Sequence, residues 1–280
     1  MATRGLSLPS APTGLNEIAS IDWQAPWLKD WTAWGQPIAA DALAHASDSE
    51  HPVADALNRA RQMHCPDLPI DFVVQGSLPQ GMAYEAFIRE QGAIPTRDNA
   101  HDFFNGLAWL HTPRLKTRLN ELQATEIQAM GVGSTRGPVR DAITVLDENG
   151  ALLLAPDFIW QALRSRHWQA LFIDLRPLWA QCRLWPFGHA LQEKLLIPRK
   201  PMVAHVLDLP LPLGADDWAS VDSHVGEALH GSFMATKPFL PMPVLGIPGW
   251  CPDNADLAFY ADSGVFRPIR QVLDKSQRQE

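Results

Sequence analysis

Apolar residues recur every three or four positions over much of this chain, the spacing that places them on one face of a helix. Leu115, Leu119 and Leu122 form one such stripe, and the Thr112-Pro113 pair before it is typical of a helix start. The stripe ends at Gly131-Val132-Gly133. The same periodicity predicts further helices over residues 51–63, 82–91, 99–110, 156–164, 188–197 and 216–230, with Gly92 and Gly231 as stops.

Runs that favour β-structure are fewer. Residues 70–74 and 202–207 each predict one short strand. Asn149-Gly150 stands between two further β-prone runs, and this dipeptide is typical of a two-residue hairpin turn. We therefore predict a β-hairpin that pairs residues 142–146 with 151–155, after a loop over 136–140.

Proline changes the picture in the last third of the chain. The prolines, 24 in all, are dense after residue 186 and interrupt long helices there, so residues 237–252 are expected to wrap the surface. The predicted fold class is α+β: a mainly helical single domain with one β-hairpin and a Pro-rich C-terminal third. This compact domain covers residues 17–272, between a flexible arm over 1–16 and a loose tail over 273–280.

Tryptophan is unusually common, with 11 residues against two tyrosines. Trp27, Trp31 and Trp34 repeat at helical spacing after Pro26, so we predict that they lie mostly buried on one helix face. If they were exposed, they would instead offer a contact surface for a partner.

Composition narrows the class of protein. The chain of 280 residues is 46% hydrophobic with a formal charge of −8, which argues against nucleic acid as a partner. No apolar run is long enough for a membrane span, and the N-terminal residues lack the apolar segment of a signal peptide. Three cysteines, far apart, suit a reducing compartment, so we expect a cytoplasmic protein.

Polar side chains suited to chemistry gather on the helix predicted over 99–110. His101, Asp102 and Asn105 fall on one face, and an imidazole, a carboxylate and a carboxamide there can orient a proton, a metal or a substrate. The same side chains could equally form a polar seam that holds one helix against another. Arg97 and Lys116 are the candidates for substrate binding.

Two further groups could complete a site. Arg140 and Asp141 precede the predicted hairpin, where they could pin it, or where the arginine could clamp a carboxylate or phosphate. His189 and Glu193 lie four residues apart on a short helix, so they could offer two ligands to a divalent metal, or simply form an exposed salt-bridging face. In an enzyme, His101 and His189 should lie within about 10 Å of each other.

Common catalytic motifs are absent from the sequence. It contains no glycine-rich phosphate loop, no His-Glu-x-x-His zinc motif and no Gly-x-Ser-x-Gly nucleophile turn. Common nucleotide enzymes, zinc proteases and α/β-hydrolases are therefore disfavoured.

Several blocks, taken in order, are similar to those of a known family: Tyr84-Glu85-Ala86-Phe87-Ile88, His101-Asp102-Phe103-Phe104-Asn105, Arg140-Asp141-Ala142-Ile143, Gly188-His189-Ala190-Leu191, Phe259-Tyr260 and Val265-Phe266-Arg267-Pro268. Together they cover about residues 80–270, and by them the chain resembles the bacterial family called domain of unknown function 3025. The resemblance implies a bacterial, cytosolic protein and implies no activity.

Two functions from different classes remain open. The first is an enzyme of hydrolase or lyase type, with a pocket built from the His101 helix, the Arg140-Asp141 segment and the His189 helix, either metal-assisted or using His101 as a general base. The second is a non-catalytic binding or assembly protein, whose partner is a small molecule or a protein and whose same polar residues form a buried structural network.

Overall fold

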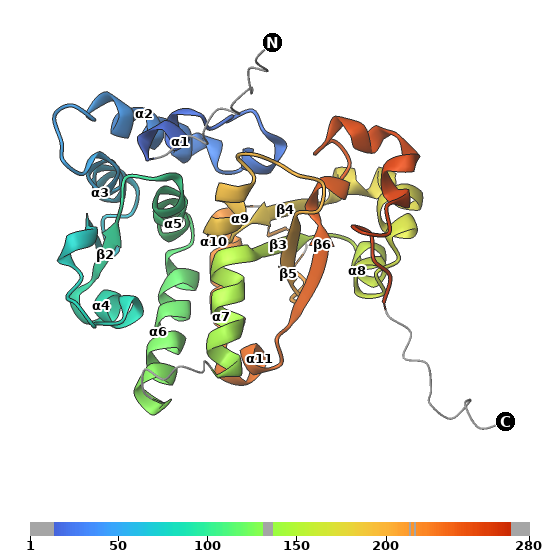
Figure 1. Ribbon diagram of the computed structural model, residues 1–280. Helices are drawn as coiled ribbons and strands as arrows, with labels where there is room; N and C mark the ends of the chain where they lie inside the picture. Colours follow the sequence, from blue (N-terminus) through green and yellow to red (C-terminus); the bar gives the residue numbers. More distant parts are fainter. Residues whose placement is uncertain (1–13, 131–136, 213, 216, 270–280) are drawn as a thin grey trace, which may run out of the picture. The chain divides into compact units, whose positions relative to one another are not determined.

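The computed structural model of the chain describes residues 14–130, 137–212, 214–215 and 217–269 (Figure 1). Most of the arm expected over 1–16, the tail over 273–280 and the helix stop at Gly131-Val132-Gly133 lie outside these residues. Contacts group the chain into two compact units, residues 1–134 and 135–280, here unit 1 and unit 2. The fold is α+β and mainly helical, as predicted, and the single domain over 17–272 stays a prediction.

Unit 1 is mainly helical and carries one small parallel sheet. Its helices are α1 (Leu15–Ala19), α2 (Thr32–Ala44), α3 (Pro52–His64), α4 (Tyr84–Gln91), α5 (Ala100–His111) and α6 (Pro113–Met130), with 3-10 turns at Pro26–Leu28 and Gln75–Ser77. Strand β1 (Asp71–Val74) pairs with β2 (Ala93–Thr96). The predicted helices over 51–63, 82–91 and 99–110 and the strand over 70–74 are therefore confirmed. Gly92 ends α4 with a φ of 60°, a left-handed conformation that glycine adopts without strain.

The tryptophans near the N-terminus do not share one helix face. Trp27 lies in the 3-10 turn, Trp31 just precedes α2, and Trp34 lies within α2. Trp31 is fully buried and the other two are half-buried. The prediction of a single helix face was wrong because the chain turns between the 3-10 segment and α2.

Unit 2 is built around a four-stranded mixed sheet of strand order β4-β3-β5-β6. The strands are β3 (Gly150–Leu154), β4 (Arg183–Pro186), β5 (Val203–Leu207) and β6 (Phe239–Pro243); β3 and β5 run parallel, and the other pairs are antiparallel. The helices are α7 (Pro138–Asn149), α8 (Asp157–Arg164), α9 (His189–Lys194), α10 (Trp218–Ala228) and α11 (Gly231–Ala235). A π-helical turn at Ala170–Asp174, η4 (Arg176–Gln181) and three later 3-10 turns, Val244–Gly246, Pro252–Ala255 and Leu257–Ala261, complete the unit.

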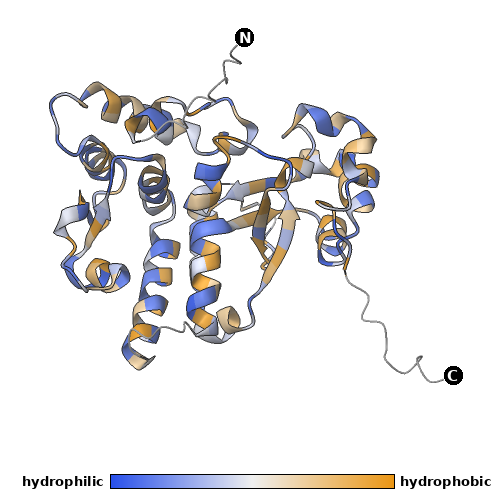
Figure 2. Cartoon of the chain, in the orientation of Figure 1, coloured by the Kyte–Doolittle hydropathy of each residue, from blue (hydrophilic) through white to orange (hydrophobic). Residues whose placement is uncertain are grey.

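Helix α7 lies against the sheet and contacts both β3 and β5 (Figure 1). Val139, Ile143 and Leu146 point into the core from one face of this helix and are buried. Hydrophobic residues are concentrated in the central strands of the sheet (Figure 2). Burial of these two facing surfaces is what fixes α7 on the sheet.

The predicted hairpin at Asn149-Gly150 was wrong. Residues 142–146 belong to α7, which continues to Asn149, and Gly150 begins β3 directly. The buried positions in α7 repeat at helical spacing, so burial of a helical stripe overrides the local turn signal. The loop expected over 136–140 was wrong from Pro138 onward for the same reason.

Two further expectations for the C-terminal third also differ from the structure. Residues 237–252 include β6, an edge strand paired with β5, and so do not simply wrap the surface. Helix α10 ends at Ala228, and Gly231 begins α11 instead of closing α10. Among the described helices, none combines the length and the apolar character that crossing a membrane requires.

Candidate functional site

The N-terminus of α5 is held by hydrogen bonds from side chains. Asn99 is the N-cap, and its Oδ1 accepts from the backbone N of Asp102 at 2.8 Å. The carboxylate of Glu17 on α1 accepts from the backbone N of Ala100 at 3.0 Å. Two of the otherwise unsatisfied N–H groups of the first turn are therefore satisfied within unit 1.

Asp102 is buried and its carboxylate is fully engaged by Arg97. One oxygen accepts from the backbone N of Arg97 at 2.7 Å and from its Nε at 2.9 Å, and the other accepts from Nη2 at 3.0 Å. Asp102 is the third helical residue of α5, where a carboxylate complements the helix dipole. Asp102, predicted as a catalytic residue, and Arg97, predicted to bind substrate, thus form one ion pair.

Asn105, one turn further along α5, bridges two other side chains. Its Nδ2 donates to the hydroxyl of Tyr84 at 3.0 Å, and its Oδ1 accepts from Nζ of Lys116 at 2.8 Å. Lys116 is only 4% exposed, and its Nζ lies 5.5 Å from the ring centroid of Trp109. The carboxamide therefore positions a buried ammonium group.

The same line of polar contacts continues along α6. Asn120 donates to the backbone carbonyl of Glu85 at 2.9 Å, and Gln123 donates to the Glu85 carboxylate at 2.8 Å. Lys116, Asn120 and Gln123 lie four and three residues apart, which places them on one helix face. We call the contacts of Tyr84, Glu85, Asn105, Lys116, Asn120 and Gln123 the polar seam; it joins α4, α5 and α6.

In unit 2, the neighbouring residues Arg140 and Asp141 do not share contact partners among the described residues. Arg140 is 8% exposed, and its Nε has no hydrogen-bond partner within the described part of the chain. Asp141 is half-buried, and its carboxylate lies 3.4 Å from Nζ of Lys237. Neither of them pins a hairpin, because both lie in the first turns of α7.

His189 lies close to a carboxylate that the sequence did not single out. Its Nδ1 is 4.0 Å from an oxygen of Asp147 on α7. His189 is buried, and Glu193, one turn further along α9, is half-buried. No group of three or more His, Cys, Asp or Glu side chains among the described residues could hold a metal ion.

Of the predicted site, unit 1 brings together Arg97 with Asp102, and Asn105 with Lys116. His101 is half-buried in the first turn of α5. His189 and Glu193 belong to unit 2. The convergence of His101 and His189, and a metal at Glu193, stay predictions.

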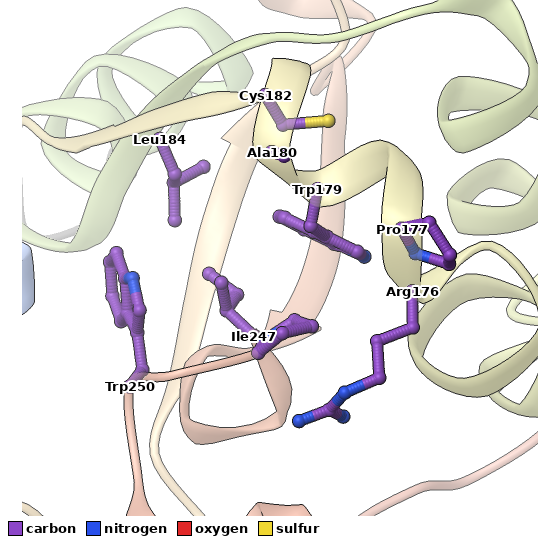
Figure 3. A pocket seen from close by; sticks show the side chains of 9 residues that line it. Arg176, Pro177, Trp179, Ala180, Cys182, Leu184, Ile247 and Trp250 are labelled. Carbon is purple, nitrogen blue, oxygen red and sulfur yellow. The ribbon is translucent and has the colours of Figure 1, made fainter.

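A pocket of about 410 Å³ lies entirely within unit 2 (Figure 3). It is walled by η4, by Cys182 and Leu184 at the start of β4, and by the segment that follows β6. The residues that define it are Arg176, Trp179, Cys182, Leu184, Ile247 and Trp250. Figure 3 shows the indole rings of Trp179 and Trp250 on either side of Ile247, so the walls are mainly apolar and aromatic.

Arg176 supplies the charge at this pocket. Its Nη1 donates to the hydroxyl of Tyr260 at 3.0 Å and to the carbonyl of Phe172 at 3.5 Å, and its Nη2 donates to Oδ1 of Asn254 at 3.3 Å. All three acceptors are neutral. Burial raises the pKa of the Tyr260 hydroxyl, opposed by the hydrogen bond from Arg176, so the phenol stays protonated near neutral pH.

This pocket was not predicted from the sequence. Its walls come from segments about 70 residues apart, around Arg176 and around Trp250. The high tryptophan content was a signal for aromatic surfaces, but nothing in the local pattern paired Trp179 with Trp250.

Comparison with known proteins places residues 70–270 within the model of one family, described as a protein of unknown function, DUF3025. No curated protein and no solved structure matches the chain. The matched residues include α4, α5 and α6 and the sheet of unit 2 with its pocket. Because the match covers well over half of the sequence, the chain belongs to the DUF3025 family.

Proposed function

We propose that the protein binds a small molecule in the pocket of unit 2 and that the polar seam of unit 1 is structural. The observation that carries this proposal is the pocket itself, where aromatic and aliphatic walls lie beside a single guanidinium group. Small-molecule sites are mostly apolar cavities of roughly 300–1,000 Å³ with a few polar groups that fix orientation.

The contacts of α5 support a structural role for Asp102 and Asn105, which the sequence offered as catalytic residues. A general base needs a lone pair that can reach a substrate proton. The Asp102 carboxylate already accepts three hydrogen bonds from Arg97, and Asn105 is held from both sides by Tyr84 and Lys116. These groups are better arranged to hold helices together than to exchange protons.

The chemistry of the pocket lining supports binding without turnover. The residues that line the pocket include no His, Asp or Glu that could move a proton. Burial raises the pKa of the Cys182 thiol to about 12, so the sulfur stays a thiol and is a poor nucleophile. Arginine remains charged at all ordinary pH values, which suits it to binding.

The test is a panel of small aromatic and aliphatic compounds of positive, zero and negative charge, measured by ligand-observed NMR on the full chain. We expect some of them to bind, and we expect Ala180→Trp to abolish that binding. Ala180 lines the pocket and is exposed, so a larger side chain there fills the cavity without removing a polar contact. Binding that is unchanged in Ala180→Trp would place the ligand elsewhere and contradict the proposal.

A second candidate, the hydrolase or lyase, keeps one specific observation in its favour. The Asp147 carboxylate lies 4.0 Å from Nδ1 of His189, where its charge favours the imidazolium that a general base becomes. Turnover of an ester, amide or phosphomonoester that is lost in His189→Asn, at unchanged thermal stability, would favour this candidate.

A further inference from the structure

We infer that the ligand of the unit 2 pocket carries a carboxylate on a flat apolar body, as an aromatic or indolic monocarboxylic acid does. Arg176 would bind the carboxylate, and Trp179 and Trp250 would flank the ring. This inference rests on the proposed function, because it names the ligand class of the same pocket.

Arg176 has two hydrogen-bond donors that the described part of the folded chain does not use. A guanidinium group has five N–H donors. Nη1 uses both of its donors, on Tyr260 and Phe172, and Nη2 uses one, on Asn254. The donor on Nε and the second donor on Nη2 have no acceptor within the described residues. Two adjacent N–H groups of one guanidinium are the pair that a carboxylate binds in a bidentate manner.

The positive charge of Arg176 has no carboxylate beside it among the described residues. Arg176 forms no ion pair with any described carboxylate, and its bound acceptors are a phenol, an amide and a backbone carbonyl. A cation held beside apolar walls without a counter-charge attracts an anion more strongly than it would in water. The aromatic faces alone could also attract a cation, but the charge of Arg176 disfavours one.

Two of the acceptors of Arg176 are themselves held by hydrogen bonds. Asn254 is 1% exposed, and its Nδ2 donates to the carbonyls of Leu245 at 2.8 Å and Ile247 at 2.7 Å, which fixes its Oδ1 towards Arg176. The Tyr260 hydroxyl donates to the carbonyl of Gly246 at 2.9 Å. Arg176 is therefore held in place before any ligand binds, which lowers the entropic cost of binding.

The apolar walls of the pocket suit a flat ring. Nε1 of Trp179 donates to the carbonyl of Leu171 at 2.8 Å, so this indole offers the pocket only its carbon surface. Leu184 and Ile247 add aliphatic surface. At about 410 Å³ the cavity lies towards the small end of ligand sites, which suits one ring system with a short acidic side chain.

The experiment uses three probes that share one ring system: indole-3-acetate, indole-3-acetamide and tryptamine. Their dissociation constants for the full chain are measured by isothermal titration calorimetry and ligand-observed NMR. A charged hydrogen-bonded pair adds more than a neutral one, so we expect indole-3-acetate to bind about tenfold or more tightly than the amide. We expect no binding of tryptamine.

Two variants and one control locate the effect. Arg176→Gln should reduce the preference for indole-3-acetate over the amide to about one. Ala180→Trp should abolish binding of every probe while leaving the contacts of Arg176 in place. Arg164→Gln is the matched control, because Arg164 is an arginine of the same unit that pairs with Asp208 at the surface and does not line the pocket.

The outcomes separate this inference from the proposed function. Equal binding of the acid and the amide that is lost in Ala180→Trp would overturn the carboxylate inference and keep a small-molecule pocket. A preference for the acid that persists in Arg176→Gln would also overturn the inference. Failure of the three probes overturns the carboxylate inference, and failure of the whole charge panel overturns the proposed function as well.

Discussion

His111 lies in the core of unit 1, where its ring stacks on Trp34 with centroids 4.5 Å apart and meets Trp31 edge-on at 5.0 Å. The exposed His64 also stacks on Trp34, with ring centroids 4.6 Å apart. Burial, and to a lesser degree the nearby His64, lowers the pKa of His111 from 6.5 to about 3. The folded chain therefore favours the neutral imidazole.

This shift gives a pH dependence of stability whose sign is fixed. Below pH 6.5 the unfolded chain takes up a proton at His111 and the folded chain does not until about pH 3. The free energy of unfolding should therefore fall as the pH drops through this window, by up to about 1.4 kcal/mol per pH unit, and this contribution is constant above it.

Urea denaturation at pH 7 and at about pH 5 measures the effect. Replacing His111 by Phe keeps a stacking ring and removes the titration. From pH 7 to about pH 5, the free energy of unfolding should therefore fall by roughly 2 kcal/mol less in His111→Phe than in the parent chain. The exposed His45 provides the control, and His45→Gln should behave as the parent does. An equal loss in His111→Phe and the parent would contradict the burial of a neutral imidazole.

Single residues were the part of the fold that the sequence could predict best. Gly92 as the end of α4 is confirmed, because this stop depends only on the conformation of its own backbone. The partners of Asp102 and Asn105 were not predicted in full. They depend on which helices pack together, and local spacing contains no such information.

At the scale of elements, the junction between α7 and β3 depends on two glycines. An added Cβ at Gly150 would collide with the carbonyl of Leu146, and one at Gly188 would collide with the backbone of Glu148 and Asn149. Gly150 has an ordinary φ of −74°, so close approach of backbone, and not a turn conformation, requires glycine there. Asn149-Gly150 therefore marks a tight helix-to-strand junction and not the turn of a hairpin.

Substitution of Gly188 tests this junction. Gly188→Ala should lower the free energy of unfolding by about 2–3 kcal/mol, since the clash is with backbone and cannot be relieved by a rotamer change. Gly231→Ala is the matched control in the same unit, because a Cβ there meets nothing within 4 Å. It should be neutral or slightly stabilising. Equal effects in a denaturant titration would show that the junction tolerates a side chain.

Helix α5 offers a test of the structural role of its polar face. Asp102→Asn removes the charge that binds Arg97 and keeps the size of the side chain, so it should cost about 1–3 kcal/mol of stability. It should leave the binding of indole-3-acetate unchanged, since the pocket belongs to unit 2. Thermal unfolding and titration calorimetry on the same samples measure both effects.

The matched control is Asp67→Asn, which changes an exposed carboxylate of the same unit. It should alter neither stability nor binding. If Asp102→Asn instead left stability unchanged and abolished an enzymatic activity of the parent chain, the catalytic role of this face would be restored.

For the molecule as a whole, the fold class could be predicted from the sequence, but the order of the strands and the position of the pocket could not. Helical periodicity identified most helices because it is a local property, and the α+β class followed from it. The sheet order β4-β3-β5-β6 and the Arg176 pocket join segments that are distant along the chain, and only the folded backbone brings them together. The site was instead predicted at the His101 helix, the Arg140-Asp141 segment and the His189 helix, where polar residues lie close together in the sequence.

The large side chains of unit 2 suggest that this unit folds by itself. Its four-stranded sheet and helices α7 to α11 come entirely from residues after 137, and Trp160, Trp185, Phe172 and Phe187 are fully buried there. We predict that a fragment of residues 135–280 unfolds in one cooperative step, with coincident transitions by circular dichroism and tryptophan fluorescence. It should bind indole-3-acetate as the full chain does.

A shorter fragment, residues 135–238, is the control for this prediction. It lacks β6, which pairs along its whole length with β5, and the loop that carries Ile247 and Trp250. Strand β5 would then expose unpaired backbone groups along one edge, and two walls of the pocket would be missing, so this fragment should neither unfold cooperatively nor bind the probe. If the longer fragment behaves like the shorter one, unit 2 depends on unit 1 for folding, and the single compact domain expected over residues 17–272 is the better description of the molecule.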